Sequence, residues 1–348
     1  MVMVIGIDPH KASHTAVAVD STGKVVGQVT VKARDQGHTQ LLSWGRRVAG
    51  DERVWAVEDC RHVSGRLERA LLVHGERVVR VPPKLMGRLR REQRGYGKSD
   101  PIDATAVARA ALREGDLPVA TLAGRSLDVR LLVDRREDLV GERTREINRI
   151  QWHLHDLDPD LPAKGRLTTR RGLQHIADRL DQLDGVRAQV CRESVERVDQ
   201  LNHVIDEYQR EIEQLVRQHW PELLDIDGCG VLSAAKLVGE IGDPRRFSRE
   251  QKLAMHAGVA PLPVSSGERQ RHRLNRHGNR QLNVAIHRIA VNQCKKHGSA
   301  GRAYRDRKMS EGKTKLEALR CLKRQISRTI YRTLREASVE TAIAAALT

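Results

Sequence analysis

The chain has 348 residues, 39% of them apolar and only 3% aromatic, so its length predicts two or three domains with largely aliphatic cores. A formal net charge of +17 favours a polyanionic partner, most simply nucleic acid, over a chain that is basic only through Arg-rich residue usage. The five cysteines form no CxxC pair, and no apolar run reaches transmembrane length, which argues against a zinc site, a disulfide framework and a membrane protein. The first residues also lack a signal-peptide pattern, so we expect a cytoplasmic location.

Residues 1–125 are predicted to form an α/β domain. Apolar and alternating runs, bounded by turn-forming residues, indicate strands interspersed with amphipathic helices. We expect two strands within 2–19, further strands at 27–32, 54–58 and 77–81, and helices at 39–48, 64–74 and 100–112. This order of elements is typical of a ribonuclease-H-like domain.

Four carboxylates stand at the ends of these elements. Asp8 ends the first strand and Glu58 ends the fourth, while Asp100 and Asp103 open a helix that Ser99 or Asp100 would cap. The spacing of the two helical aspartates, i and i+3, places them on one helix face. All four carboxylates therefore belong to one α/β unit.

A carboxylate in a strand as apolar as the first one needs a partner, because an unpaired buried charge is costly. That partner could be a metal ion, a basic side chain or backbone donors, and Glu58 could instead pair with Arg61. Four carboxylates in matching settings favour a hard cation such as Mg²⁺, which prefers oxygen ligands. Two such cations could clamp the attacking and leaving oxygens of a phosphoryl transfer.

Basic residues cluster in two other places. The segment 84–98, which ends in a glycine-rich loop just before Asp100, and the tail 295–335 are candidates for contact with nucleic-acid backbone. Solvated helix faces are the alternative explanation for part of this charge. The candidate nucleic-acid-binding residues of the first segment are Arg88, Arg91, Arg94 and Lys98.

Residues 126–220 are predicted to be helical. One helix is expected at 130–157 and a loop at 164–172, followed by a second long helix. Apolar residues of that second helix recur every three or four positions, the spacing of a coiled-coil seam. A helical hairpin, an intermolecular coiled coil or an ordinary amphipathic helix would each produce this pattern. The seam residues are Val198, Leu201, Ile205, Tyr208, Ile212 and Leu215.

From residue 221 the chain forms a predicted helical unit. Gly228 and Gly230 resemble a helix-hairpin-helix turn, whose backbone N–H groups can hold a DNA phosphate, although a plain connection between helices is equally compatible. Helices are expected at 231–241, 247–257 and 281–294, and mainly helical structure in the basic tail 295–335.

A turn at 258–267 is expected to present Ser265 and Ser266. A serine hydroxyl becomes a nucleophile only when a base or a metal activates it. The alternative is that these residues merely form a turn. Arg269, Arg271 and Arg273 follow, and guanidinium groups can bond two phosphate oxygens, as a scissile phosphate would require.

Two blocks of this sequence resemble the insertion-sequence-110 family of transposases, also called bridge-RNA-guided serine recombinases. The first block is similar to the DEDD motif of that family, and the second to its C-terminal transposase domain. The first comprises 6–11, the strand ending at Glu58, and 98–104; the second comprises 226–230, 240–243, 258–261 and 265–267. At the hairpin position the family often carries Pro-Gly, where this chain has Asp227-Gly228.

The resemblance implies a RuvC-like (ribonuclease-H-like) DEDD domain at 1–125, a helical coiled-coil region at 126–220, a helical transposase domain at 221–335 and a tail at 336–348. It implies recombination between donor and target DNA, selected by a structured guide RNA. It also implies that Asp8, Glu58, Asp100 and Asp103 bind Mg²⁺ beside a serine of another protomer, in a homo-oligomer that is a dimer or a tetramer. Ser266 falls on the family's serine by motif position, with Ser265 as the alternative.

Two other functions fit part of the sequence. A Holliday-junction-resolvase-like nuclease would use the carboxylates alone and would not need the serine. A non-enzymatic, basic scaffold would bind nucleic acid and need neither.

Overall fold

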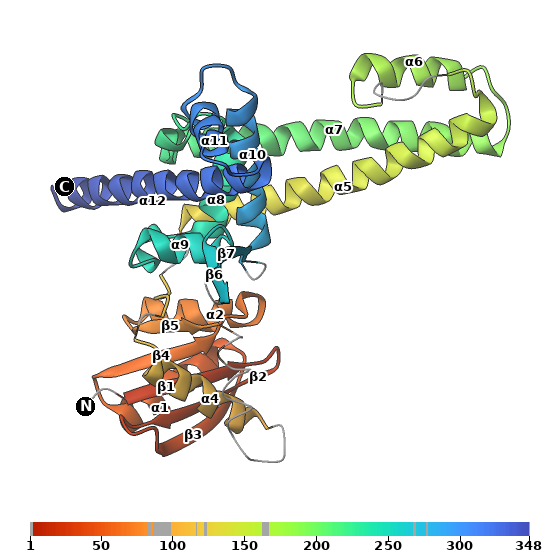
Figure 1. Ribbon diagram of the computed structural model, residues 1–348. Coiled ribbons are helices and arrows are strands. Elements are labelled where there is room, and N and C mark those ends of the chain that lie inside the picture. The colour runs from red at the N-terminus through yellow and green to blue at the C-terminus, as the bar shows by residue number, and fades with distance from the viewer. Residues whose placement is uncertain are drawn as a thin grey trace. The chain divides into compact units, whose positions relative to one another are not determined.

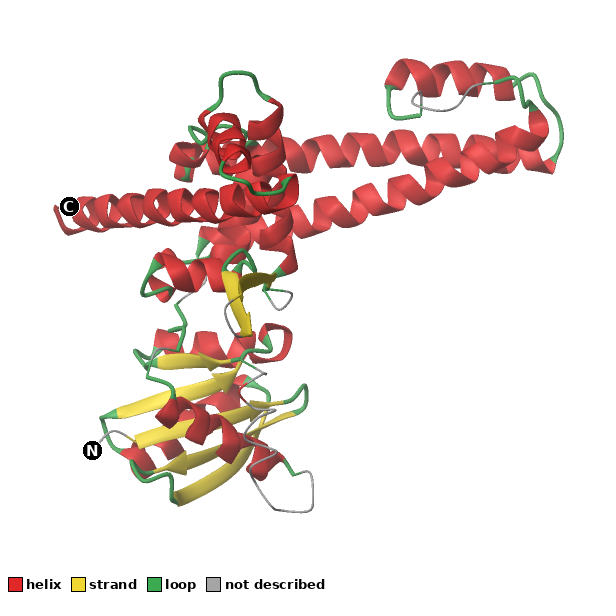
Figure 2. Cartoon of the chain, in the orientation of Figure 1, coloured by secondary structure: helices red, strands yellow, loops and turns green. Residues whose placement is uncertain are grey.

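The computed structural model describes residues 3–82, 85, 99–115, 117–121, 124–161, 167–266, 269–275 and 278–347. The chain divides into two compact units, Met1–Gly124 with Arg245–Ser248, and Arg125–Pro244 with Arg249–Thr348. Figures 1 and 2 show the sheet of the first unit and the long helices of the second. The finer division into four segments stays a prediction.

The first unit is built on a five-stranded sheet with the order β3-β2-β1-β4-β5. β2 is antiparallel to β1 and β3, whereas β1, β4 and β5 run parallel to one another. This is the mixed sheet expected of a ribonuclease-H-like domain, so the predicted fold class is confirmed. The strands are β1 (Met3–Pro9), β2 (Ser13–Val19), β3 (Val25–Lys32), β4 (Arg53–Glu58) and β5 (Val78–Val81).

Helices cover both faces of this sheet. Side chains alternate between the faces along each strand, so Ile5 and Ile7 enter one core and Val4 enters the other. The helices α1 (Asp35–Ala49) and α2 (Arg61–Val73) pack on the first core, and α4 (Asp100–Arg113) packs on the second.

The second unit begins with three helices, where sequence analysis predicted two. They are α5 (Arg125–Leu157), α6 (Arg170–Leu180) and α7 (Val186–His219). The expected loop ends early because Thr169 caps α6 by accepting a hydrogen bond from the Gly172 N–H. The expected single helix is interrupted because Gly185 adopts a φ of 101°, which breaks the helical path before α7.

The helices α5 and α7 lie side by side and run in opposite directions (Figure 1). Leu139 contacts the α7 residues Leu201 and Ile205, and further along α5 Ile150 packs with Val195 of α7. That this seam forms a coiled coil, within the chain or with a second copy of it, stays a prediction.

The rest of the second unit is helical apart from one β-hairpin. Its elements are η1 (Pro221–Leu223), α8 (Val231–Ile241), α9 (Glu250–His256), β6 (Pro261–Ser266), β7 (Arg269–Leu274), α10 (Arg280–Lys295), α11 (Ala300–Ser310) and α12 (Lys315–Leu347); the short η2 (Pro244–Arg246) lies at the boundary of the two units. None of the helices in the described ranges combines the length and the apolar character that a membrane crossing needs.

The turn predicted at 258–267 is wrong for most of its length, because Pro261–Ser266 form the strand β6. β6 pairs antiparallel with β7, with Ser265 opposite Gln270 and Ser266 opposite Arg269. The prolines that suggested a turn, Pro261 and Pro263, are two residues apart. They are tolerated because every strand of a two-stranded sheet is an edge strand, whose outward-facing N–H groups need no partner.

Candidate active site

Two of the four predicted carboxylates lie at neighbouring strand ends. The parallel pairing of β1 and β4 runs as far as Ile7 and Val57, and Asp8 and Glu58 are the next residues of each strand. By the alternation of side chains, Asp8 lies on the same face as Val4, and Glu58 on the same face as Ala56. Both positions belong to the face that α4 covers.

Gly6 brings α4 to these strand ends. A Cβ atom at this position would lie 2.2 Å from the Ala104 carbonyl oxygen and 2.4 Å from the Ala108 nitrogen. The helix backbone therefore rests directly on β1, which only glycine on the strand and small residues on the helix permit. This contact sets the first turn of α4, with Asp100 and Asp103, next to Asp8.

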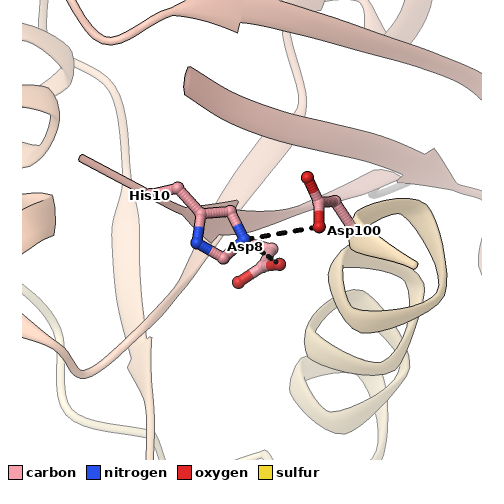
Figure 3. Close-up of side chains that lie close together, drawn as sticks. All are labelled: Asp8, His10 and Asp100. Atoms are coloured by element: carbon pink, nitrogen blue, oxygen red, sulfur yellow. Dashed lines mark hydrogen bonds and ion pairs between the residues drawn. The ribbon is translucent and has the colours of Figure 1, made fainter. Parts of the chain in front are cut away.

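Asp8 and Asp100 meet at a histidine that the sequence analysis did not single out. The Nε2 atom of His10 lies 3.1 Å from Oδ2 of Asp8 and 3.4 Å from Oδ1 of Asp100 (Figure 3). One ligand atom from each of these residues can be chosen so that all three lie within 4.8 Å of one another. Asp8 is 5% exposed, whereas the side chains of His10 and Asp100 are about half exposed, so the cluster opens toward solvent. The sequence signal that could have identified His10 is its position two residues after a strand-end aspartate.

The electrostatics of the cluster favour a cation. Burial raises the pKa of the Asp8 carboxyl, and the nearby Asp103 and Asp100 carboxylates raise it further, while His10 lowers it. Glu58 and Asp8 both influence the thiol of Cys60. Burial, followed by the negative charges of these two carboxylates, raises the pKa of that thiol to about 11. The four carboxylates thus influence the pKa values of neighbouring groups in one region, where a divalent ion would offset their mutual repulsion.

The donor set fits such an ion. Carboxylate oxygens are hard ligands for divalent cations, and Asp8 and Asp100 present theirs from two different elements toward one point. Glu58 and Asp103 are near enough to influence the same groups electrostatically. Their individual roles as ligands stay predictions.

The predicted nucleophile lies in the second unit. The backbone of β6 carries Ser265 and Ser266, and β7 carries Arg269, Arg271 and Arg273 at alternate positions. Because alternate residues of a strand share a face, the three arginine positions occur on one side of the hairpin. The side chains of 263–266 and 269–274 lie outside the described part of the chain.

The predicted nucleic-acid contacts are placed only in part. Arg88, Arg91, Arg94 and Lys98 lie outside the described residues. In the basic tail, Lys308 pairs with Glu311 at 2.6 Å and Lys296 pairs with Asp227 at 2.6 Å, so some of its charge is balanced within the unit.

The glycine turn before α8 is held by α10. Gln293 donates to the Asp227 carbonyl at 2.7 Å, and Asn292 donates to the Gly228 carbonyl at 3.2 Å. These bonds leave the N-terminus of α8, which has Gly230 at its N-cap and no side-chain cap, as the part of the turn that a phosphate could approach.

Two family models match the chain, one after the other. A DEDD model of the IS110 type, described as "Transposase", matches residues 5–159, and one described as "Transposase IS116/IS110/IS902 family" matches residues 221–306. The chain carries the two transposase domains of the IS110 family. Members of this family are transposases, which are DNA-processing enzymes. The DEDD assignment, together with the Asp8, His10 and Asp100 cluster, indicates a divalent-metal site in this transposase.

Individual relatives agree with the family. The uncharacterized 44.8 kDa protein of insertion element IS116 from Streptomyces clavuligerus is 28% identical, over 95% of this chain and 94% of its own. The uncharacterized 42 kDa protein of insertion element IS900 from Mycobacterium paratuberculosis is 25% identical, over 96% of each chain. The transposase for IS1111A from Coxiella burnetii is 27% identical over 50% of this chain and 48% of its own. Among solved structures, Thermus thermophilus RuvC matches 34% of this chain and 99% of its own with 18% identity and a TM-score of 0.28.

Proposed function

We propose that this insertion-sequence transposase cuts and rejoins donor and target DNA through a serine nucleophile that works beside a Mg²⁺-binding carboxylate cluster. The observation that carries the proposal is the convergence of Asp8 and Asp100, from a strand end and a helix start, on one point. A buried aspartate beside further acidic groups is costly in a purely structural role, and a metal site accounts for it.

In this proposal Asp8, Glu58, Asp100 and Asp103 hold the metal, and His10 lies at its edge. Bound Mg²⁺ would neutralise charge on the phosphate that reacts. Asp8, the most buried of the three residues in the cluster, anchors the site, and the half-exposed Asp100 faces the side from which DNA would approach.

Ser266 is proposed as the nucleophile, with Ser265 as the alternative. Its hydroxyl would lose a proton as Oγ forms a bond to phosphorus and one P–O ester bond of the DNA backbone breaks, and the leaving oxygen takes up a proton. The resulting phosphoserine link conserves the ester for rejoining, which suits recombination better than hydrolysis. Arg269, Arg271 and Arg273, on alternate positions of β7, would hold the phosphate.

The partners proposed are donor DNA, target DNA and a structured guide RNA. Base pairing with that RNA would select the DNA sites, while the basic residues of the chain hold backbone phosphates. The serine is proposed to act in the site of another protomer of a homo-oligomer. The net charge of +17 supports a large polyanionic partner.

The first experiment is to express the transposase with its native flanking DNA and to sequence the RNA that co-purifies at moderate salt. One discrete structured RNA, with loops that match two DNA sites, is the expected result. A random sample of cellular RNA would contradict the guided mechanism.

The second experiment tests the chemistry with Asp8→Ala and Ser266→Ala. Both substitutions should abolish recombination while DNA binding survives. Continued strand cleavage by a variant that carries both Ser265→Ala and Ser266→Ala would favour a resolvase-like nuclease, and an Asp8→Ala variant that yields the same DNA products as the unmodified protein would favour a binding scaffold.

A further inference from the structure

The hairpin that carries the candidate serines is fastened to the end of α9 by three asparagines, which we call the asparagine clamp: Asn275, Asn279 and Asn283. Asn275 donates from Nδ2 to the Met255 carbonyl at 3.0 Å. The backbone N–H of Asn279 donates to the His256 carbonyl at 2.6 Å.

Asn283 completes the clamp. Its Nδ2 donates to the Ala257 carbonyl at 2.9 Å and to the Gly258 carbonyl at 3.2 Å. Four consecutive carbonyls, from the last turn of α9 to the residues that enter the hairpin, are therefore occupied. Met255 and His256 belong to the last turn of α9, where carbonyls lack i+4 partners within the helix, and Ala257 and Gly258 follow it.

The two ends of the hairpin also touch through their backbones. A Cβ atom at Gly278 would lie 2.2 Å from the Gly258 nitrogen, so no larger residue fits at that position. Gly258 itself has a φ of 68°, a conformation that favours glycine. The entry and the exit of the hairpin are thus fixed against each other.

A buried lysine on α12 orients this clamp. Lys323 is 9% exposed, and its Nζ atom donates to Oδ1 of Asn283 at 2.6 Å. An ammonium group can only donate, so it holds the oxygen of the Asn283 amide toward α12. The NH₂ group of the same amide must then face the two carbonyls at the hairpin entry.

We propose that Lys323 and Asn283 are positioning residues that set the hairpin, and with it Ser266, at the angle that the reaction requires. The inference rests on the proposed serine chemistry. A two-stranded hairpin is at best marginally stable alone, so its direction must come from its attachment. A nucleophile that is misplaced by about 1 Å can lose on the order of a hundredfold in rate.

The test uses Lys323→Met, which keeps an unbranched apolar stem and removes the donor, and Asn283→Asp, which cannot donate to the two carbonyls. Gln325→Met, at an exposed and uncharged position of the same helix, is the matched control. Hydrogen exchange of the backbone amides in β6 and β7 is measured beside the rate of covalent protein–DNA adduct formation and the affinity for DNA.

In both variants we expect exchange in the hairpin to accelerate at least tenfold while exchange in α8 stays unchanged. The adduct should form at least tenfold more slowly, with DNA affinity unaltered. Lys323→Gln, which restores a donor, should recover part of the rate. Unchanged hairpin exchange would overturn the proposal, as would an equal acceleration throughout the second unit, since that result means a general loss of stability.

Failure of the serine chemistry gives a different result. If Ser266→Ala and Ser265→Ala both still form the adduct, the proposed nucleophile is wrong, while the exchange data still decide whether Lys323 and Asn283 fix the hairpin.

Discussion

The carboxylate cluster and the serine hairpin contrast in how they are held. Asp8 ends a strand that is buried on both faces, and α4 rests on that strand backbone-to-backbone at Gly6. The hairpin has only two strands, and hydrogen bonds from asparagine side chains fasten it to the end of α9. Close packing fixes the first region and polar contacts fix the second, so the two regions should respond to different substitutions.

The largest effect is expected at the buried end of the packed region. Asp8→Asn should lower the rate of DNA strand cleavage on the order of a thousandfold, because it removes charge where metal-assisted catalysis needs it. The same substitution should stabilise the metal-free protein, since it removes the cost of burying a charge and relieves repulsion with Asp103 and Asp100. Cleavage assays and thermal unfolding without metal measure the two effects.

Asp51→Asn, at a fully exposed position of the same unit, is the control and should change neither quantity. A variant at Asp8 that loses stability together with activity would contradict a metal role and indicate a structural one.

Gly6→Ala tests the packing itself. The added Cβ would meet the backbone of α4, so we expect a loss of about 3 kcal/mol in the free energy of unfolding. Displacement of α4 should also weaken divalent-metal binding by about tenfold or more, although no ligand has changed. Chemical denaturation and metal titration are the measurements.

Gly65→Ala is the matched control, because no atom lies within 4 Å of a Cβ at that helical position. It should be neutral or stabilising by up to about 1 kcal/mol. Equal metal affinity in both variants would mean that the contact at Gly6 does not position the carboxylates.

Lowering the pH should reduce the stability of the first unit, because two of its histidines are buried. His14 and His38 stack with their ring centroids 5.4 Å apart, and burial followed by the nearby His38 lowers the pKa of His14 to about 4. Between the unfolded pKa of about 6.5 and pH 4, the unfolded state binds a proton at this histidine and the folded state does not. The free energy of unfolding is therefore unaffected above pH 6.5, and it falls by about 3 kcal/mol as the pH drops to 4.

His14→Gln removes this titrating group and should reduce the pH dependence of stability between 6.5 and 4, while burial of His38, which also lowers the pKa of that residue, preserves part of it. Segment-resolved hydrogen exchange at several pH values separates the two units, and the acid-induced change should be confined to the sheet. The same slope in variant and unmodified protein would contradict the assignment.

Local signals in the sequence were sufficient to predict much of the packed region. Alternating apolar residues mark β1 and β4, and the Asp-Pro pair at 100–101 marks the start of α4. The strand-end and helix-start positions of the four carboxylates follow directly from these elements. The contact at Gly6 does not, because it depends on which helix returns to the strand about a hundred residues later.

The polar region was harder to predict. Prolines such as Pro261 and Pro263 argue against a strand, so the sequence predicts a turn where the structure has a hairpin. The partners of Asn283 are backbone carbonyls and a lysine 40 residues away, and no local pattern marks such contacts. His10 was missed because a single histidine after a strand has no periodicity.

The smallest expected effect concerns His10, which can supply a nitrogen ligand to an otherwise carboxylate site. Imidazole suits transition metals better than it suits magnesium. We therefore expect His10→Ser to weaken Mn²⁺ binding by about tenfold and Mg²⁺ binding by less. Pulsed electron paramagnetic resonance of bound Mn²⁺ should show a nitrogen coupling in the unmodified protein that disappears in His10→Ser. His14→Gln is the control and should keep the coupling, because His14 is buried on the strand that follows. A nitrogen coupling that survives in His10→Ser would mean that His10 only hydrogen-bonds to Asp8 and Asp100. The metal would then rest on carboxylates alone, and packing would fix every one of its ligands.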